Sequence, residues 1–171
     1  MEHFLISIIP SEDIAIRIRE LRTHIFKGFG LVSARCLPEI LPVAFIKEII
    51  SKEKFQELAQ SSELTSKNFI TTETNDIFLQ INNSDFINNI RKIITSYSLE
   101  GIITIESGIY LGSAEKKSDI KEIISFIQRK EGNYLTWKKN SLELIKIETF
   151  NEIWWENVRW ETIWNQKIKL L

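Results

Sequence analysis

The stretch that decides how the chain begins to fold is Phe4-Leu5-Ile6-Ser7-Ile8-Ile9, followed by Pro10-Ser11. A run that is apolar at nearly every position predicts a strand that is covered on both faces. Pro10 ends the strand, and Ser11 is a residue type that caps helices. Apolar residues then recur at helical spacing, which predicts a helix with one buried face; they are Ile14, Ile18, Leu21 and Ile25.

The rest of the chain continues this alternation of strands and helices. Strand patterns are expected over 31–36, 42–50, 69–74, 77–81, 102–111, 142–147 and 158–164. Helices are expected over 12–28 and 52–60, from Ser84 onward, and from Ser118 to Gly132. Each half has a long helix ahead of an apolar strand. We therefore predict an α+β fold: one domain over 1–171, with two similar lobes of antiparallel strands and helices around a central cleft.

Composition restricts the classes of function. The 171 residues are 43% hydrophobic and 26% charged with net charge −1, so we expect an ordered globular protein that no overall field draws to nucleic acid or to membranes. Cys36 is the single cysteine, so no intramolecular disulfide can form and a reducing compartment is the simpler interpretation. No apolar run approaches the roughly 20 residues of a membrane span. We predict a cytoplasmic protein without a membrane partner.

Two apolar strands occupy matching positions in the two halves. They are Leu41-Pro42-Val43-Ala44-Phe45-Ile46 and Gly108-Ile109-Tyr110-Leu111-Gly112. Together with the element order and the helix that opens with Pro10-Ser11, these strands resemble the two-histidine (2H) phosphoesterase superfamily, which includes the RNA 2′,3′-cyclic phosphodiesterases. The resemblance covers nearly the whole chain. It implies a two-lobed fold with a cleft between the two motif strands.

The signature of that superfamily is a His-x-Thr/Ser motif on one strand of each lobe, and this chain departs from it twice. The resemblance places Val43 at the first histidine position and Phe45 at the first hydroxyl position. It places Gly108 at the second histidine position and Tyr110 at the second hydroxyl position. All four are thus degenerate motif positions, and we expect no catalytic residue among them.

The chemical consequence concerns acid–base catalysis. In the superfamily, one histidine takes a proton from the attacking oxygen and the other gives a proton to the leaving oxygen. Val43 and Gly108 have no titratable group, and Tyr110, with a reference pKa of about 10, is a poor base at neutral pH. If each histidine contributes ~10²–10⁴-fold, the loss of both removes most of the rate.

Other residue patterns give no cofactor or metal site. His3 and His24 are the only histidines, and a zinc site needs about four suitable ligands at fixed spacing. His3 adjoins the first strand and is more typical of an edge position than of a ligand. Gly28-Phe29-Gly30 lacks the third glycine and the Lys-Ser/Thr of phosphate-binding loops. We expect no cofactor and no metal.

The C-terminal tryptophans allow two interpretations. Trp154, Trp155, Trp160 and Trp164 are four of the five tryptophans, and aromatic side chains can stack on nucleic-acid bases. The alternation of Val158, Trp160 and Trp164 favours core packing instead, with Trp160 buried against the helix that carries Ile123 and Ile127.

Three hypotheses follow for function. The chain is a non-catalytic 2H-like protein whose cleft is filled by Phe45 and Tyr110 or reused to bind a ligand or protein. Alternatively, it is a divergent phosphoesterase for cyclic or 2′–5′ nucleotide phosphodiesters. The third alternative is a structural protein that forms a homodimer through the Trp-rich C-terminus. Candidate contacts to a nucleotide or RNA ligand in the cleft are Arg35, Tyr110, Lys138 and Arg159.

Overall fold

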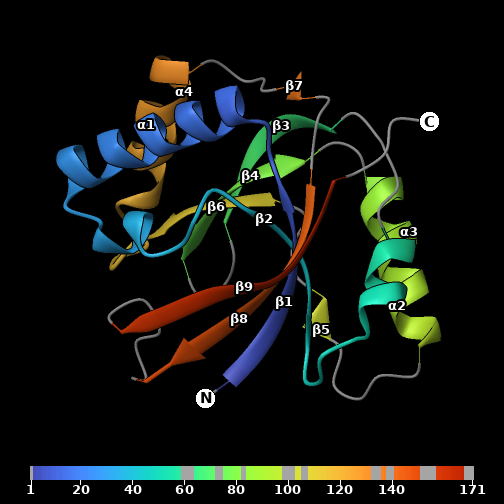
Figure 1. Cartoon of the computed structure of the whole chain (residues 1–171). Coiled ribbons are helices and arrows are strands. Elements are labelled where there is room, and N and C mark those ends of the chain that lie inside the picture. The colour runs from blue at the N-terminus through green and yellow to red at the C-terminus, as the bar shows by residue number, and fades with distance from the viewer. Residues whose placement is uncertain are drawn as a thin grey trace.

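The computed structural model describes residues 2–58, 64–71, 75–81, 84–97, 103–104, 108–131, 136–137, 141–150 and 157–167. Strands and helices alternate along the chain (Figure 1). In order they are β1 (Glu2–Ile9), α1 (Glu12–Phe29), the 3₁₀ helix η1 (Val32–Arg35), β2 (Leu41–Ile46), α2 (Lys52–Glu57), β3 (Leu64–Thr71), β4 (Asp76–Ile81), α3 (Ser84–Ser96), β5 (Ile103–Thr104), β6 (Gly108–Ser113), α4 (Ile120–Glu131), β7 (Thr136–Trp137), β8 (Ser141–Thr149) and β9 (Val158–Lys167).

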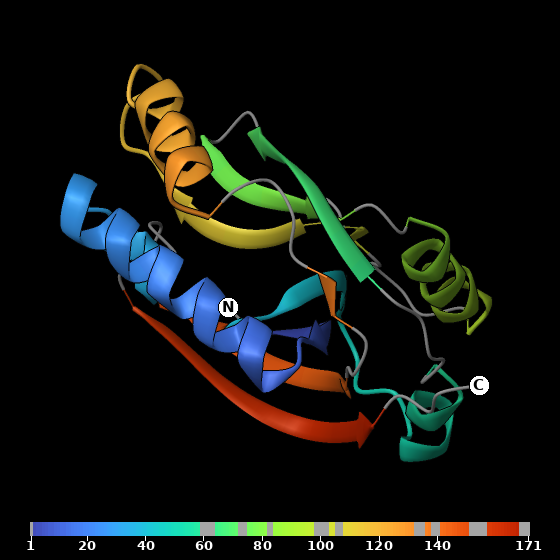
Figure 2. The ribbon, with the colours of Figure 1, turned by 90° about the horizontal axis from the view of Figure 1, so that it is seen from above.

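The strands form two antiparallel sheets. One has five strands in the order β5-β2-β1-β8-β9, and the other has four in the order β6-β4-β3-β7. Both views place α1 beside α4 and place α2 and α3 together at the other end of the molecule (Figures 1 and 2). Mixed helices and antiparallel sheets confirm the predicted α+β class.

Helix α1 follows the expectation from its sequence. Ser11 is the N-cap residue with an extended backbone, although its side chain makes no capping hydrogen bond. Gly30 ends the helix at φ 70, and its N–H donates to the Phe26 carbonyl at 2.8 Å. A left-handed residue at this position favours glycine because no Cβ is strained. Within the described residues, no helix is both long enough and apolar enough to cross a membrane.

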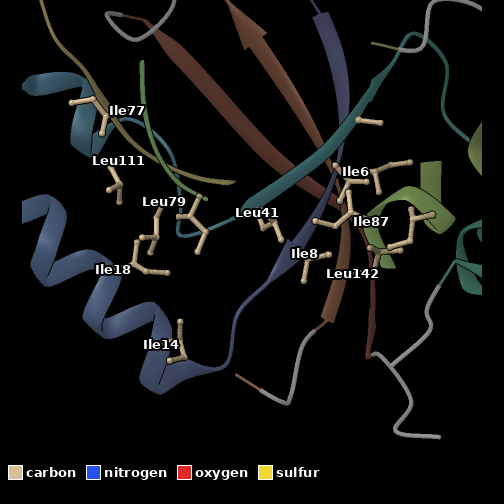
Figure 3. Close-up of a cluster of buried hydrophobic side chains, with 14 of the residues drawn as sticks. Ile6, Ile8, Ile14, Ile18, Leu41, Ile77, Leu79, Ile87, Leu111 and Leu142 are labelled. Carbon is tan, nitrogen blue, oxygen red and sulfur yellow. The ribbon is translucent and has the colours of Figure 1, made fainter. Parts of the chain in front are cut away.

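A large apolar core lies between the helices and both sheets. Figure 3 shows side chains from α1, β1, β2, β4, β6 and β8 converging there, among them Ile6, Ile18, Leu79 and Leu111. Each fully buried aliphatic side chain contributes about 1.5–3 kcal/mol to folding. A smaller cluster on the opposite face of the five-stranded sheet contains Leu5, Ile40, Ile145 and Ile147. That second face borders the cavity described below.

Two strand predictions were wrong. The strand predicted over 31–36 is instead the 3₁₀ helix η1 (Val32–Arg35) with its two flanking residues. The short apolar pattern of this segment does not distinguish a helical turn from a strand. Residues 102–111 do not form one long strand. They contribute β5 to the five-stranded sheet and β6 to the four-stranded sheet, so the chain crosses between the two sheets here.

The predicted burial of Trp160 was also wrong. Trp160 pairs with Ile147 and is 48% exposed, whereas Trp164 pairs with Leu144 and packs against the large core. A register shift between Leu144 and Ile145 adds one residue to β9, so the two tryptophans lie on opposite faces. Homodimerisation through this strand stays a prediction.

Candidate functional site

A cavity of about 380 Å³ lies between the two sheets. The five-stranded sheet contributes His3, Leu5, Phe45, Ile147 and Thr149 to its wall. The segment leading into β2, and the start of that strand, add Leu37, Ile40 and Pro42. The remaining wall comes from the four-stranded sheet, which supplies Asp76, Phe78 and Tyr110. The lining is thus mostly aliphatic and aromatic, with a few polar groups.

A β-bulge decides which side chains of β2 face the cavity. Ile6 pairs with Ala44 and Ser7 pairs with Pro42, so Val43 is an extra residue without a partner in β1. Val43 is fully buried in the large core, whereas Pro42 and Phe45 line the cavity. A side chain at position 43 therefore points into the core, and Pro42 is the neighbouring residue that faces the cavity. The assignment of Val43 to the first motif position stays a prediction.

The second motif strand, β6, leaves no room for a side chain at its first position. A Cβ atom on Gly108 would lie 2.9 Å from the Phe78 Cβ and 3.0 Å from the Leu79 carbonyl oxygen. Both distances are shorter than normal contacts, so the backbone of β4 or β6 would have to move. The Phe78 ring instead meets the Tyr110 ring edge-on, with ring centroids 5.6 Å apart. Phe78 thus occupies the space beside Gly108 and forms part of the cavity wall.

Tyr110 belongs to a buried chain of hydroxyl groups. Its Oη lies 2.6 Å from Ser113 Oγ, and Ser113 Oγ donates to the Asp76 carboxylate. Ser33 ties this group to η1, because its Oγ accepts from the Ser113 N–H at 2.8 Å and donates to the Ser113 carbonyl at 3.1 Å. Burial raises the pKa of Tyr110 above its ordinary value, so its hydroxyl stays protonated at neutral pH.

Arg22 on α1 holds two parts of the cavity wall together. Its guanidinium donates to the Tyr110 carbonyl through Nε at 2.9 Å. Through Nη1 it donates to the carbonyls of Leu37 and Pro38, at 2.9 and 3.0 Å. The side chain is only 3% exposed, and burial lowers the pKa of Arg22 to about 10. Sequence reasoning missed this residue, although its position four residues after Ile18 places it on the buried face of the helix.

The other candidate ligand contacts lie elsewhere. Arg35 stacks on Phe26 at 5.4 Å, and Arg159 stacks on Phe150 at 5.3 Å. Neither arginine lines the cavity. Lys138 falls outside the described residues. Of the three candidates that the structure describes, only Tyr110 lies on the cavity wall.

The two histidines have different surroundings. His3 lines the cavity, with its ring centroid 5.8 Å from that of Phe45, so its location favours a functional role more than its sequence context did. His24 lies on α1 beside Arg19, Glu20 and Lys27, away from the cavity. Within the part of the chain that the structure describes, no group of His, Cys, Asp and Glu could hold a metal ion.

Comparison with known proteins gives a fold but no sequence family. No family model matches the sequence, and no curated protein matches it. The structure of TT0787 of Thermus thermophilus is similar with a TM-score of 0.57 at 10% identity, covering 97% of each chain. A structure described as a phosphoesterase has a TM-score of 0.53 at 12% identity, covering 99% of this chain and 100% of the other.

A third solved structure is that of E. coli LigT in complex with 3′-AMP. Its TM-score is 0.51 at 13% identity, and the match covers 99% of this chain and 98% of LigT. LigT is a 2H phosphoesterase. At such low identities, these three likenesses show a common fold over nearly the whole chain.

Proposed function

We propose that this chain, which has the 2H phosphoesterase-like fold, is a non-catalytic protein that binds a small ligand in the cavity between its sheets. The observation that carries the proposal is the composition of the cavity wall. Leu5, Phe45, Phe78 and Ile147 make it apolar, and none of the described residues that line it is a lysine or an arginine.

Such a wall is poorly suited to phosphodiester chemistry. A phosphodiester carries a negative charge, and moving it from water into apolar surroundings without cationic or hydrogen-bonding partners is costly. Pro42 and Gly108 have no titratable group where acid–base catalysis would need one. Tyr110 cannot replace a histidine as a base at neutral pH, because burial raises its pKa.

The same wall suits a small, largely apolar ligand. Ligand pockets usually enclose about 300–1,000 Å³ and combine apolar walls with a few fixed polar groups. The cavity has a volume of about 380 Å³, and Arg22 fixes its shape through hydrogen bonds to Tyr110 and Leu37. A pre-formed site loses little conformational entropy when the ligand binds.

The test combines a binding assay with an activity assay. The fluorescent probe N-phenyl-1-naphthylamine should bind the wild-type protein, and Thr149→Phe should weaken binding at least tenfold by filling the cavity. Thr95→Phe, the same change on an exposed part of α3, should leave binding unchanged. Nucleoside 2′,3′-cyclic phosphates should be hydrolysed no faster than in buffer. Absence of probe binding, or equal binding by both variants, would refute the proposal.

One observation favours a second function, a divergent phosphoesterase. His3 lies on the wall of the cavity, and a structural neighbour, LigT, was solved with 3′-AMP. In this case, a single imidazole would serve as the acid–base group. Turnover of a cyclic phosphodiester by the wild-type protein, together with its loss in His3→Gln, would establish this alternative in place of the first.

A further inference from the structure

Strand β9 forms an open edge of the five-stranded sheet. It is the last strand in the sheet order, and among the described strands only β8 pairs with it. Figure 2 shows β9, in red, along the outside of the molecule. Four consecutive residues, Arg159 to Thr162, are exposed, so solvent reaches both faces of this part of the strand. An edge strand of this kind is a template for pairing with a strand of another chain.

The regular part of this edge is short and has a defined centre. β9 begins at Val158, and the bulge at Ile163 interrupts its register after Thr162. Between these two points, every residue of β9 has a partner in β8, and Trp160 is the middle residue of this segment. Because a bulge disrupts the ladder and twists the strand, a further strand would pair with the segment from Val158 to Thr162 alone.

The sequence of this segment suits a second copy of itself. Hydrogen-bonded and non-hydrogen-bonded residue pairs alternate along an antiparallel ladder, so two copies of one strand pair only in registers that put a residue opposite its own copy. A centre at Val158 or Thr162 would pair only the end of the segment. A centre at Arg159 or Glu161 would put like charges directly opposite each other, which is destabilising. A centre at Trp160 instead puts Arg159 of each copy opposite Glu161 of the other.

Strand β8 extends this charge complementarity. Glu148 is the partner of Arg159 in β8, and Lys146 is the partner of Glu161. Pairing about Trp160 would therefore create a row of alternating charges across the two copies, from Glu148 and Arg159 to Glu161 and Lys146. The Arg159 guanidinium lies 5.3 Å from the centre of the Phe150 ring. Stacking uses the face of a guanidinium, so the N–H donors at its edge can still bind a carboxylate.

The opposite face of the segment is apolar. Trp160 lies opposite Ile147, a buried residue that lines the cavity, so the Trp160 side chain is on the cavity side of the sheet. In the single chain, Trp160 is 48% exposed. Pairing about Trp160 would bring the two indole rings together and remove part of their surface from water. Aromatic pairs across antiparallel strands stabilise the pairing.

We propose that two copies of this chain form a two-fold symmetric dimer, in which their β9 strands pair antiparallel about Trp160. The two five-stranded sheets then form one continuous sheet. Because the interface is symmetric, each contact between Arg159 and Glu161 occurs twice. The paired segment is short, so the dimer is a weak and reversible one. This inference goes beyond ligand binding and does not depend on the cavity.

The test uses charge variants and sedimentation equilibrium over a range of protein concentrations at low salt. The average mass of the wild-type protein should rise with concentration toward that of a dimer. Arg159→Glu and Glu161→Lys should each raise the dissociation constant at least tenfold, because each puts like charges opposite each other. An equal mixture of the two variants should dimerise as the wild-type protein does, because opposite charges then face each other. Arg129→Glu, the same change at an exposed site of α4, should leave dimerisation unchanged.

Circular dichroism shows whether each variant is folded, and each outcome bears on the proposal. A wild-type protein that stays monomeric up to millimolar concentration would overturn it. A dimer that neither Arg159→Glu nor Glu161→Lys weakens, or a mixture of the two folded variants that stays monomeric, would overturn it as well. The wild-type protein decides the case even if the variants do not fold. Amide hydrogen exchange within Val158 to Thr162 should slow as the concentration rises, and unchanged exchange would contradict pairing through β9.

Discussion

Replacing Gly108 with alanine tests the close approach of β6 to β4, which leaves no room for a side chain at position 108. The added Cβ would lie 2.9 Å from the Phe78 Cβ and 3.0 Å from the Leu79 carbonyl oxygen. Neither atom is the end of a flexible side chain that could turn away. Strand β4 is also held on both sides, since it pairs with β6 and β3. The clash must therefore be relieved by moving backbone, either that of β4 inside the sheet or that of β6 at its edge.

The magnitude follows from two opposing effects. Overpacking a well-packed site costs about 1–3 kcal/mol. Replacing glycine with alanine recovers about 0.4–1 kcal/mol through the unfolded state, where the backbone has fewer accessible conformations. We therefore expect Gly108→Ala to lower the free energy of unfolding by roughly 1–2 kcal/mol. That is a substantial part of the ~5–15 kcal/mol that stabilises a typical domain.

Gly28 provides the matched control. It lies within α1, and a Cβ there would meet the Phe126 ring at 3.9 Å, an ordinary contact. Alanine is a better helix former than glycine by about 1 kcal/mol, so Gly28→Ala should raise stability by up to that amount. Urea unfolding followed by circular dichroism measures both changes through linear extrapolation. If Gly108→Ala were as stable as the wild-type protein, β6 and β4 would not approach as closely as described.

Two further predictions concern packing and titration. Trp160→Ala should lower the free energy of unfolding by less than about 1 kcal/mol, because Trp160 is 48% exposed. Trp164→Ala should lower it clearly more, toward the ~3–5 kcal/mol of a buried tryptophan. Equal losses of stability in thermal melts would contradict the opposite orientation of the two rings. Burial raises the folded-state pKa of Tyr110, so the stability linked to its hydroxyl is complete below pH of about 10 and is lost as the pH rises through the folded-state value. Tyr110→Phe should therefore show a shallower fall in unfolding free energy above pH ~10 than the wild-type protein, and parallel curves would refute this.

The elements that the sequence predicted well are those with strong, regular patterns. The strand over 4–9 and the helix after Ser11 were correct, because a continuous apolar run and a helical period of apolar residues each have one common structural solution. The position of Gly30 also indicated the end of the helix. The order of elements was sufficient to predict the two-lobed α+β fold, since it does not depend on exact register.

The cavity could not be predicted in the same way, because distant segments build it. Arg22 and the Tyr110 carbonyl are 88 residues apart in sequence, and Ser113 and Asp76 are 37 apart. Nothing in the local pattern around Asp76 or Phe78 indicated that they would line a cavity with Phe45. Burial of Arg22 was detectable in principle from its spacing to Ile18, but its carbonyl partners were not.

β-Bulges explain why the orientation of Trp160 was predicted wrongly, and they also decide which side chains line the cavity. Extra residues interrupt the pairing of β2 at Val43, of β6 at Leu111 and of β9 at Ile163. Each one reverses the inside–outside alternation beyond it, which a period-two pattern cannot reveal.

The bulge in β2 and the close approach at β6 have a common consequence for catalysis. A histidine placed at position 43 would point into the large core, and one placed at position 108 would collide with Phe78. Substitution to histidine would therefore not by itself make this cavity a two-histidine site. The register of β2 and the packing at position 108 would keep both histidine side chains out of the cavity. A double change to histidine should leave the chain inactive, because neither imidazole could reach the cavity without a rearranged sheet. Under the proposed function, the apolar lining of the cavity by Leu5, Phe45, Phe78 and Ile147 would serve to bind a ligand.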